Sequence, residues 1–206
     1  MHSKTEKIQK EYARLAQKYD EHWRVYLEAT HKHAMEMLEP EKSDRILDAS
    51  AGTGLLAGMI RRQVPCELSL IDISDEMLSV ARNRLANDPF TRIRKMDVHA
   101  LDYPDAYFSK IVCLNSFHFY ENPEKVLSEF SRVLKKSGKL VMVAWCRDPW
   151  HFRLFDVAMR ITQRPYAGSH TSAELQRLLK VSGFTVSKSR RWSHRFWSLL
   201  NIQAEK

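Results

Sequence analysis

The stretch Arg45-Ile-Leu-Asp-Ala-Ser-Ala-Gly-Thr-Gly54 decides the fold. Its first four residues are typical of a short buried strand, and the small residues that follow form a turn into a helix expected from Thr53 to Arg62. Glycine has no Cβ and reaches positive φ, so the backbone of such a turn can pass close to a ligand. The stretch therefore predicts a strand-turn-helix unit with a ligand site at its turn.

Downstream of this unit, strand-like and helix-like segments alternate as far as Trp145. Alternation at this spacing predicts a mostly parallel sheet with helices on both faces. The expected strands are Leu68–Asp72, Thr91–Met96, Lys110–Asn115 and Lys139–Trp145, and the expected helices are Asp75–Asn87, with Ser74 as its N-cap, and Pro123–Lys135.

The two ends of the chain depart from this alternation. Apolar residues at helical spacing from Lys4 to Leu38 predict two helices with a break near Tyr19-Asp20. After Trp150 the pattern predicts helices near His151–Ile161 and Ser172–Val181, then strands at Phe184–Ser189 and Phe196–Ala204. A short link such as Trp192-Ser-His joins antiparallel neighbours, so the last strand is expected to run opposite to the others.

Length and composition are those of one globular domain. The chain has 206 residues, 44% of them hydrophobic and 28% charged, and no stretch of Gly, Ser or Pro is long enough for a linker. No apolar leader follows Met1 and no run of eighteen apolar residues occurs, which predicts a cytoplasmic protein.

The formal charge of +8 is concentrated in the last third of the chain, as Lys188–Arg195 followed by Phe196-Trp197. A basic stretch with interleaved aromatic residues is typical of a nucleic-acid surface or of transient contact with a membrane surface. The same residues alternate as a strand pair does, so an ordinary solvated hairpin is the competing interpretation.

Acidic residues stand where two further strands end. Ligands of open α/β sheets bind outside the carboxyl ends of the strands. Asp72 ends the second strand about twenty residues after the glycine turn, where a carboxylate can accept both hydrogen bonds of a ribose diol. Asp97 ends the third strand, where it could accept from an adenine amino group while Val98 covers the ring.

Four stretches together resemble the class I S-adenosylmethionine-dependent methyltransferases, in the branch of the quinone-biosynthesis C-methyltransferases and many small-molecule enzymes. They are Arg45–Gly54, Leu70-Ile-Asp-Ile-Ser-Asp-Glu-Met-Leu78, Met96-Asp-Val98 and Phe130-Ser-Arg-Val-Leu-Lys-Lys-Ser-Gly-Lys-Leu140. The resemblance implies an α/β, Rossmann-like, seven-stranded and mostly parallel sheet with an antiparallel last strand and an N-terminal helical cap. It implies one methyltransferase domain over 1–206, with N-terminal helices in 1–40, a cofactor-binding core in 41–146 and an acceptor side with the strand pair in 147–206.

The resemblance also implies a site for S-adenosyl-L-methionine, with S-adenosyl-L-homocysteine as product and no metal. Ser50, Ala51 and Gly52 would border the methionine part, Asp72 the ribose, Asp97 and Val98 the adenine, and the Asn115 backbone the cofactor's amino group. Tyr12 or Tyr19 would close the pocket. The full expected set is Tyr19, Asp48, Ser50, Ala51, Gly52, Gly54, Asp72, Ile73, Met77, Asp97, Val98 and Asn115.

Three positions depart from the family's pattern. Ser50 replaces the first glycine of the turn, Ser109 replaces an Asp before the fourth strand, and Lys136-Ser137 replaces Pro-Gly. Ser50 matters most, because a Cβ at that turn requires strain or permitted dihedrals and can weaken cofactor binding.

The acceptor is expected to be a small organic molecule, because aromatic residues follow the fourth and fifth strands. These residues, Phe117, Phe119, Trp145, Trp150 and Phe152, favour an aromatic or lipid-soluble ring. Methyl transfer needs an in-line nucleophile held away from water, and a base is optional. His118 is the expected general base, with a packing role as the alternative.

Three other functions fit some of these residues. Gly52-Thr-Gly-Leu-Leu-Ala57 also satisfies the dinucleotide pattern of a nicotinamide oxidoreductase. The Ser50 departure leaves room for a non-catalytic cofactor-binding module. The basic hairpin leaves room for an RNA methyltransferase, although nucleic acid is the less favoured partner because no Asn/Asp-Pro-Pro-aromatic sequence follows the fourth strand.

Overall fold

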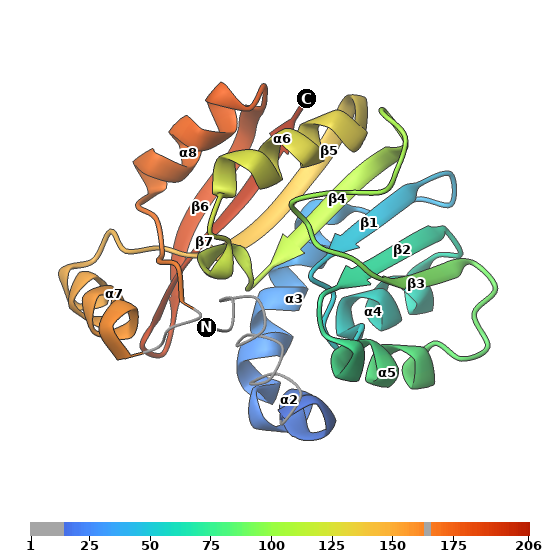
Figure 1. Ribbon diagram of the computed structural model, residues 1–206, viewed down its shortest axis with the longest axis horizontal. Coiled ribbons are helices and arrows are strands. Elements are labelled where there is room, and N and C mark those ends of the chain that lie inside the picture. Colours follow the sequence, from blue (N-terminus) through green and yellow to red (C-terminus); the bar gives the residue numbers. More distant parts are fainter. Residues whose placement is uncertain (1–14, 163–165) are drawn as a thin grey trace.

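The computed structural model describes residues 15–162 and 166–206. Its centre is a seven-stranded sheet in the order β3-β2-β1-β4-β5-β7-β6 (Figure 1). The chain order reverses between β1 and β4, the type of position where ligands bind in open α/β sheets. The strands are β1 (Arg45–Ala49), β2 (Glu67–Asp72), β3 (Thr91–Lys95), β4 (Phe108–Leu114), β5 (Leu134–Trp145), β6 (Thr185–His194) and β7 (Trp197–Glu205).

Strands β1 to β5 pair in parallel, and β7 lies antiparallel between β5 and β6. The predicted mostly parallel sheet with a reversed last strand is therefore confirmed. The turn of the final hairpin differs from the expected Trp192-Ser-His link. Pairing continues to His194 opposite Trp197, so the turn is Arg195-Phe196, with Arg195 at φ 53°.

Helices cover both faces of the sheet, as Figure 1 shows. One face carries α3 (Arg24–Leu38), α4 (Leu55–Gln63) and α5 (Asp75–Arg84), and the other carries α6 (Pro123–Val133) and α8 (Ser172–Val181). Strand side chains alternate between the two layers, so that Ile46 packs with the α3 side and Leu47 with the α6 side.

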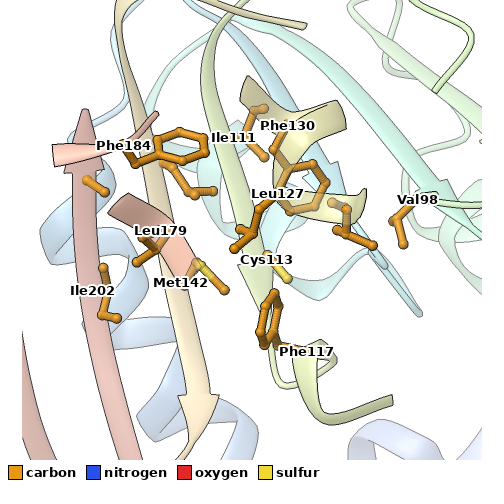
Figure 2. Close-up of a cluster of buried hydrophobic side chains, with 14 of the residues drawn as sticks. Val98, Ile111, Cys113, Phe117, Leu127, Phe130, Met142, Leu179, Phe184 and Ile202 are labelled. Carbon is orange, nitrogen blue, oxygen red and sulfur yellow. The ribbon is translucent and has the colours of Figure 1, made fainter. Parts of the chain in front are cut away.

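The centre of the core on the α6 side is closed to solvent. Figure 2 shows Leu127 and Phe130 of α6 and Leu179 of α8 packed over Cys113 and Met142 of the central strands. Each of these side chains is at most 1% exposed. The three cysteines of the chain, Cys66, Cys113 and Cys146, are free and buried.

Helix ends follow local chemistry. The Ser74 hydroxyl accepts from the Met77 amide at 3.3 Å and caps α5, as predicted. Thr171 and Glu174 form a capping box on α8. The helix expected to reach Lys135 ends at Val133, because β5 begins at Leu134, which pairs with Phe108 across a register shift.

The N-terminal helices are interrupted at two points, one of them next to the predicted break at Tyr19-Asp20. Lys18, with φ −114° and ψ 4°, separates the 3₁₀ turn η1 (Ala16–Lys18) from α2 (Tyr19–His22). The chain leaves the helix at Trp23, whose ψ is 13°, before α3 starts. Tyr12 lies outside the described residues.

The remaining helices are the 3₁₀ turn η2 (Phe117–Phe119) and α7 (Trp150–Thr162), which stands beside the tip of the β6–β7 hairpin (Figure 1). In the part of the chain that is described, no helix has both the length and the apolar character needed to cross a bilayer.

Candidate functional site

A cavity of about 330 Å³ lies at the carboxyl ends of β1, β2 and β4. It brings together eleven of the predicted cofactor residues, which come from five separate stretches of the chain. These are Tyr19, Asp48, Ser50, Ala51, Gly52, Asp72, Ile73, Met77, Asp97, Val98 and Asn115.

Two buried carboxylates face this cavity. Asp72 is held in place by the loop, because Oδ2 accepts from the Gly52 amide and Oδ1 from the Ser74 amide, each at 2.9 Å. Asp48 is 4% exposed, and its Oδ2 has no hydrogen-bond partner among the described residues. Burial, with the nearby charge of Asp72, raises the pKa of Asp48 to about 7. Burial also raises the pKa of Asp72, against the opposing effect of its backbone hydrogen bonds.

An unpartnered buried carboxylate is costly unless a ligand supplies the missing donor. The wall therefore suits a ligand that carries an ammonium or several N–H and O–H groups.

The turn between β1 and α4 has left-handed backbone at Ser50 (φ 60°), Gly52 (φ 53°) and Gly54 (φ 70°). A Cβ on Gly52 would meet no atom within 4 Å, so this glycine leaves open space beside the cavity. A Cβ on Gly54 would lie 3.0 Å from Cβ of Ala81 in α5. Gly54 does not line the cavity, and its small size serves the packing of α4 against α5.

The departures from the family pattern are accommodated by local contacts. The Ser109 hydroxyl donates to Asp44 at 2.8 Å and accepts from the Arg45 amide at 3.0 Å, which ties β4 to the start of β1. Ser137, like Ser50, lies on left-handed backbone, with φ 61°. Its amide donates to the Lys206 carbonyl at 3.2 Å.

Asp97 is paired with a residue that the sequence did not single out. Its Oδ1 accepts from the His99 amide at 2.9 Å and lies 2.6 Å from His99 Nδ1. This pairing holds the pKa of Asp97 below its ordinary value. His99 also lines the cavity, and its Nε2 is buried without a partner among the described residues. The sequence contains little indication of this pair, because it is the turn after β3 that directs the His99 ring toward the Asp97 carboxylate.

The α3 helix forms another wall. The Asn115 side chain, on backbone with φ 56°, accepts from the Tyr26 hydroxyl at 2.8 Å and donates to Thr30 at 3.0 Å. Trp145 Nε1 donates to the Tyr26 hydroxyl at 2.9 Å. This network directs the Asn115 side chain toward α3, and the Asn115 amide donates to the Val143 carbonyl at 2.8 Å, so its carbonyl is the backbone group left for a ligand.

His31 also lines this wall and was missed by the sequence reasoning. Its Nδ1 lies 2.8 Å from the Leu27 carbonyl, which can only accept, so Nδ1 carries the proton and Nε2 is left as an acceptor. Burial lowers the pKa of His31 to about 4. The helical spacing of Leu27 and His31 could have placed them on one face, but the sequence does not show which part of the sheet that face covers.

His118, the expected general base, is not part of the cavity wall. Its ring stacks on Trp145 with centroids 3.7 Å apart and planes at 8°, and the residue is 2% exposed. Burial lowers its pKa to about 3, so the ring stays neutral and is a weak proton acceptor. These contacts place His118 outside the cavity wall and favour the packing role that was the alternative.

The aromatic residues expected around an acceptor separate into different environments. Phe119 lines the cavity, as does the neighbouring Tyr120. Phe117 and Phe152 are buried in the core at 2% and 0% exposure, whereas Trp150 is 74% exposed on α7. Leu27, Phe119 and Tyr120 thus give the cavity apolar and aromatic lining from α3 and from the segment after β4.

Comparison with known proteins agrees with this geometry. A family model described as a methyltransferase domain matches residues 47–142. The chain is 34% identical over 105 residues to phosphatidylethanolamine N-methyltransferase of Cereibacter sphaeroides, covering 50% of this chain and 51% of that protein. It is 31% identical over 137 residues to demethylmenaquinone methyltransferase of Thermotoga maritima, covering 64% of this chain and 58% of that protein.

The chain thus spans less than two thirds of the length of either relative. The crystal structure of a SAM-dependent methyltransferase from Aquifex aeolicus has the same fold, with a TM-score of 0.72 at 17% identity, covering 94% of this chain and 97% of that one. Residues 47–142 of the chain therefore match a methyltransferase domain, and the chain has the fold of SAM-dependent methyltransferases.

Proposed function

We propose that this protein transfers a methyl group from S-adenosylmethionine to a small, lipid-soluble organic acceptor. The observation that carries the proposal is the buried Oδ2 of Asp48 at a glycine turn, which has no partner in the part of the chain that the structure describes, with Asp72 fixed at the next strand end. A sulfonium cofactor with an amino group and a ribose diol supplies cations and donors for both carboxylates.

The residues present fit that cofactor. Gly52 leaves open space beside the cavity for the methionine part of the cofactor, and Asp72 places a carboxylate on the cavity wall where it can accept from the ribose hydroxyls. Asp97 and Val98 lie on the adenine side, where His99 adds a ring nitrogen without a partner. Tyr19 lines the cavity from α2, in keeping with a role in closing it.

The cofactor supplies an electrophilic methyl group, and the protein's task is to place an acceptor in line with it and exclude water. Leu27, Phe119 and Tyr120 give the cavity an apolar wall that suits such an acceptor. The two relatives are named for demethylmenaquinone and phosphatidylethanolamine, and both of those compounds dissolve in lipid. The proposed acceptor belongs to the same chemical class, with a quinone-type ring as the first candidate.

Calorimetric titration tests the cofactor half of the proposal. S-adenosylhomocysteine is expected to bind and NADH is not, since Asp48, Asp72 and Asp97 line the cavity together, as expected of a methyl-donor site. Binding of NADH alone would overturn the proposal in favour of the nicotinamide alternative.

Transfer of labelled methyl groups tests the acceptor half. Demethylmenaquinone-type quinols and phosphatidylethanolamine would be offered separately, beside bulk RNA. Labelling of the lipid fraction supports the proposal, whereas labelling of RNA alone overturns it. Cofactor binding without transfer to either fraction would favour the non-catalytic module.

A further inference from the structure

The outer face of α7 carries a continuous apolar stripe. Trp150, Leu154, Val157 and Ile161 follow helical spacing and are 74%, 64%, 55% and 76% exposed. The opposite face of α7 packs inward, with Phe152 and Asp156 at 0% and 2% exposure. One face of α7 is therefore buried, as in any helix packed on a core. The exposed face, which a helix of a water-soluble protein normally fills with polar residues, is apolar.

The tip of the β6–β7 hairpin extends this stripe. The Phe196 ring lies 5.2 Å from that of Phe155 and 5.7 Å from that of His151, measured between centroids, and Phe196 is 48% exposed. Figure 1 shows the hairpin tip beside α7, away from the body of the sheet. The α7 stripe and Phe196 thus form one surface, called here the α7 surface.

Among the described residues of α7 and the hairpin tip, the exposed charged side chains are cationic. Arg153 is exposed on α7, and Arg195 is exposed in the hairpin turn. Asp156 is the sole acid of α7, and it is buried and paired with Arg160 at 2.8 Å. From Thr185 to Ala204 the sequence contains no Asp or Glu. This surface is therefore complementary to a partner that is apolar inside and anionic outside.

We propose that the α7 surface docks on a bilayer that contains anionic lipid, with the apolar stripe entering the interface and the arginines contacting headgroups. A nucleic acid would match the arginines but not the stripe. A second copy packed across a two-fold axis would bring like charges together, and none of the described residues of the α7 surface is an exposed acid that could pair with them.

Docking of the α7 surface would also affect the cavity, because both lie at the same edge of the sheet. Helix α7 follows the carboxyl end of β5, the same edge of the sheet at which the cavity opens. Docking would hold that edge near the membrane, where a lipid-soluble acceptor is concentrated. This consequence rests on the proposed function, whereas the docking itself does not.

Co-sedimentation of the full chain with vesicles tests the proposal. The wild type is expected to bind vesicles of phosphatidylcholine mixed with phosphatidylglycerol, to bind pure phosphatidylcholine less, and to be released by salt. The double variant Leu154→Glu/Ile161→Glu is expected to partition about tenfold less, because it places charge within the stripe. Replacing Arg153 and Arg195 with Glu should weaken binding to the mixed vesicles while leaving the weak binding to phosphatidylcholine.

A matched pair of variants separates this surface from general effects. Val157→Glu alters the stripe, whereas Val181→Glu makes the same change at the 70% exposed end of α8. Only the first is expected to reduce vesicle binding. Thermal unfolding of all variants should match the wild type, since each replaced side chain is exposed.

Three results would overturn the proposal. In the first, the wild type stays in solution when it is added to the mixed vesicles. In the second, Val157→Glu and the wild type bind these vesicles equally. In the third, the wild type is a dimer and Leu154→Glu/Ile161→Glu converts it to a monomer. Vesicle binding needs no methyl acceptor or cofactor. It can therefore fail while calorimetry still detects binding of S-adenosylhomocysteine, and it can succeed while that binding is absent.

Discussion

The Ser50 hydroxyl lies 2.8 Å from the Tyr120 hydroxyl, which belongs to a segment 70 residues further along the chain. This contact ties the turn after β1 to the segment after β4, and the Tyr120 hydroxyl also lies 2.9 Å from Ser116 Oγ. Ser50 holds left-handed backbone at φ 60° where relatives of this type usually have glycine. The serine hydroxyl therefore gains a hydrogen bond that offsets the strain of its Cβ.

Substitutions at Ser50 should separate the strain from the hydrogen bond. Ser50→Ala keeps the strain and loses the bond, so we expect the free energy of unfolding to fall by about 1–2 kcal/mol. Ser50→Gly loses the bond but relieves the strain, and we expect a change within about 1 kcal/mol. Urea unfolding measures both, and equal losses in the two variants would show that the backbone at position 50 is not strained.

Stability should depend on pH through Asp48. Its pKa in the folded state, about 7, lies above the ordinary value of 3.8, so the folded protein keeps a proton that the unfolded chain has released. Its contribution is fully present below about pH 4 and is lost as pH rises to about 7, on the order of 4 kcal/mol. Asp48→Asn cannot ionise, so the variant should gain stability relative to the wild type across this window. Parallel unfolding curves over pH would contradict the shift.

Cofactor affinity should depend on the same proton. The ammonium of S-adenosylhomocysteine favours the ionised form of Asp48, so binding is expected to tighten as pH rises toward about 7 and to release a proton. Asp48→Asn should bind more weakly, with no such dependence. Calorimetry in buffers of different ionisation enthalpy counts the protons released, and an identical count in the variant would assign the proton to another group.

Asp72 and Asp75 offer a matched comparison. Asp72 lines the cavity, whereas Asp75 begins α5 with its side chain 56% exposed and lies 2.6 Å from Lys95. Asp72→Asn removes a charged acceptor and weakens the hold on the Gly52 amide, so S-adenosylhomocysteine affinity should fall about 10- to 100-fold. Asp75→Asn should leave the affinity within about twofold, because an exposed pair contributes little. Similar losses in both would point to the fold of this turn instead of to direct contact.

Tyr26 should be important for stability. Tyr26→Phe leaves Trp145 Nε1 and the Asn115 side-chain oxygen without their shared partner, where α3 joins the sheet. We expect a loss of about 1–3 kcal/mol in unfolding free energy, the usual cost of unpaired buried polar groups. Chemical denaturation followed by tryptophan fluorescence measures it. A neutral result would mean that water replaces the hydroxyl.

Strong local signals predicted most of the fold. The β-α alternation, the glycine turn and the short final link were enough for the parallel sheet and the reversed β7. The ends of strands were predicted less well where pairing with another strand, and not local sequence preference, decides where the strand stops. Strand β6 extends to His194 because β7 supplies hydrogen-bond partners there, and no local pattern reports that.

The sequence by itself determined which residues end the parallel strands, and parallel strands bring their carboxyl ends together. That is why Asp48, Asp72 and Asp97 could be expected at one edge. Only the tertiary structure decided which neighbouring side chains join them. The His118 ring is buried in the core and stacks on Trp145, whereas His31 and His99 line the cavity. The direction of a side chain beyond a strand end depends on packing with distant segments, and local periodicity carries no information about those contacts.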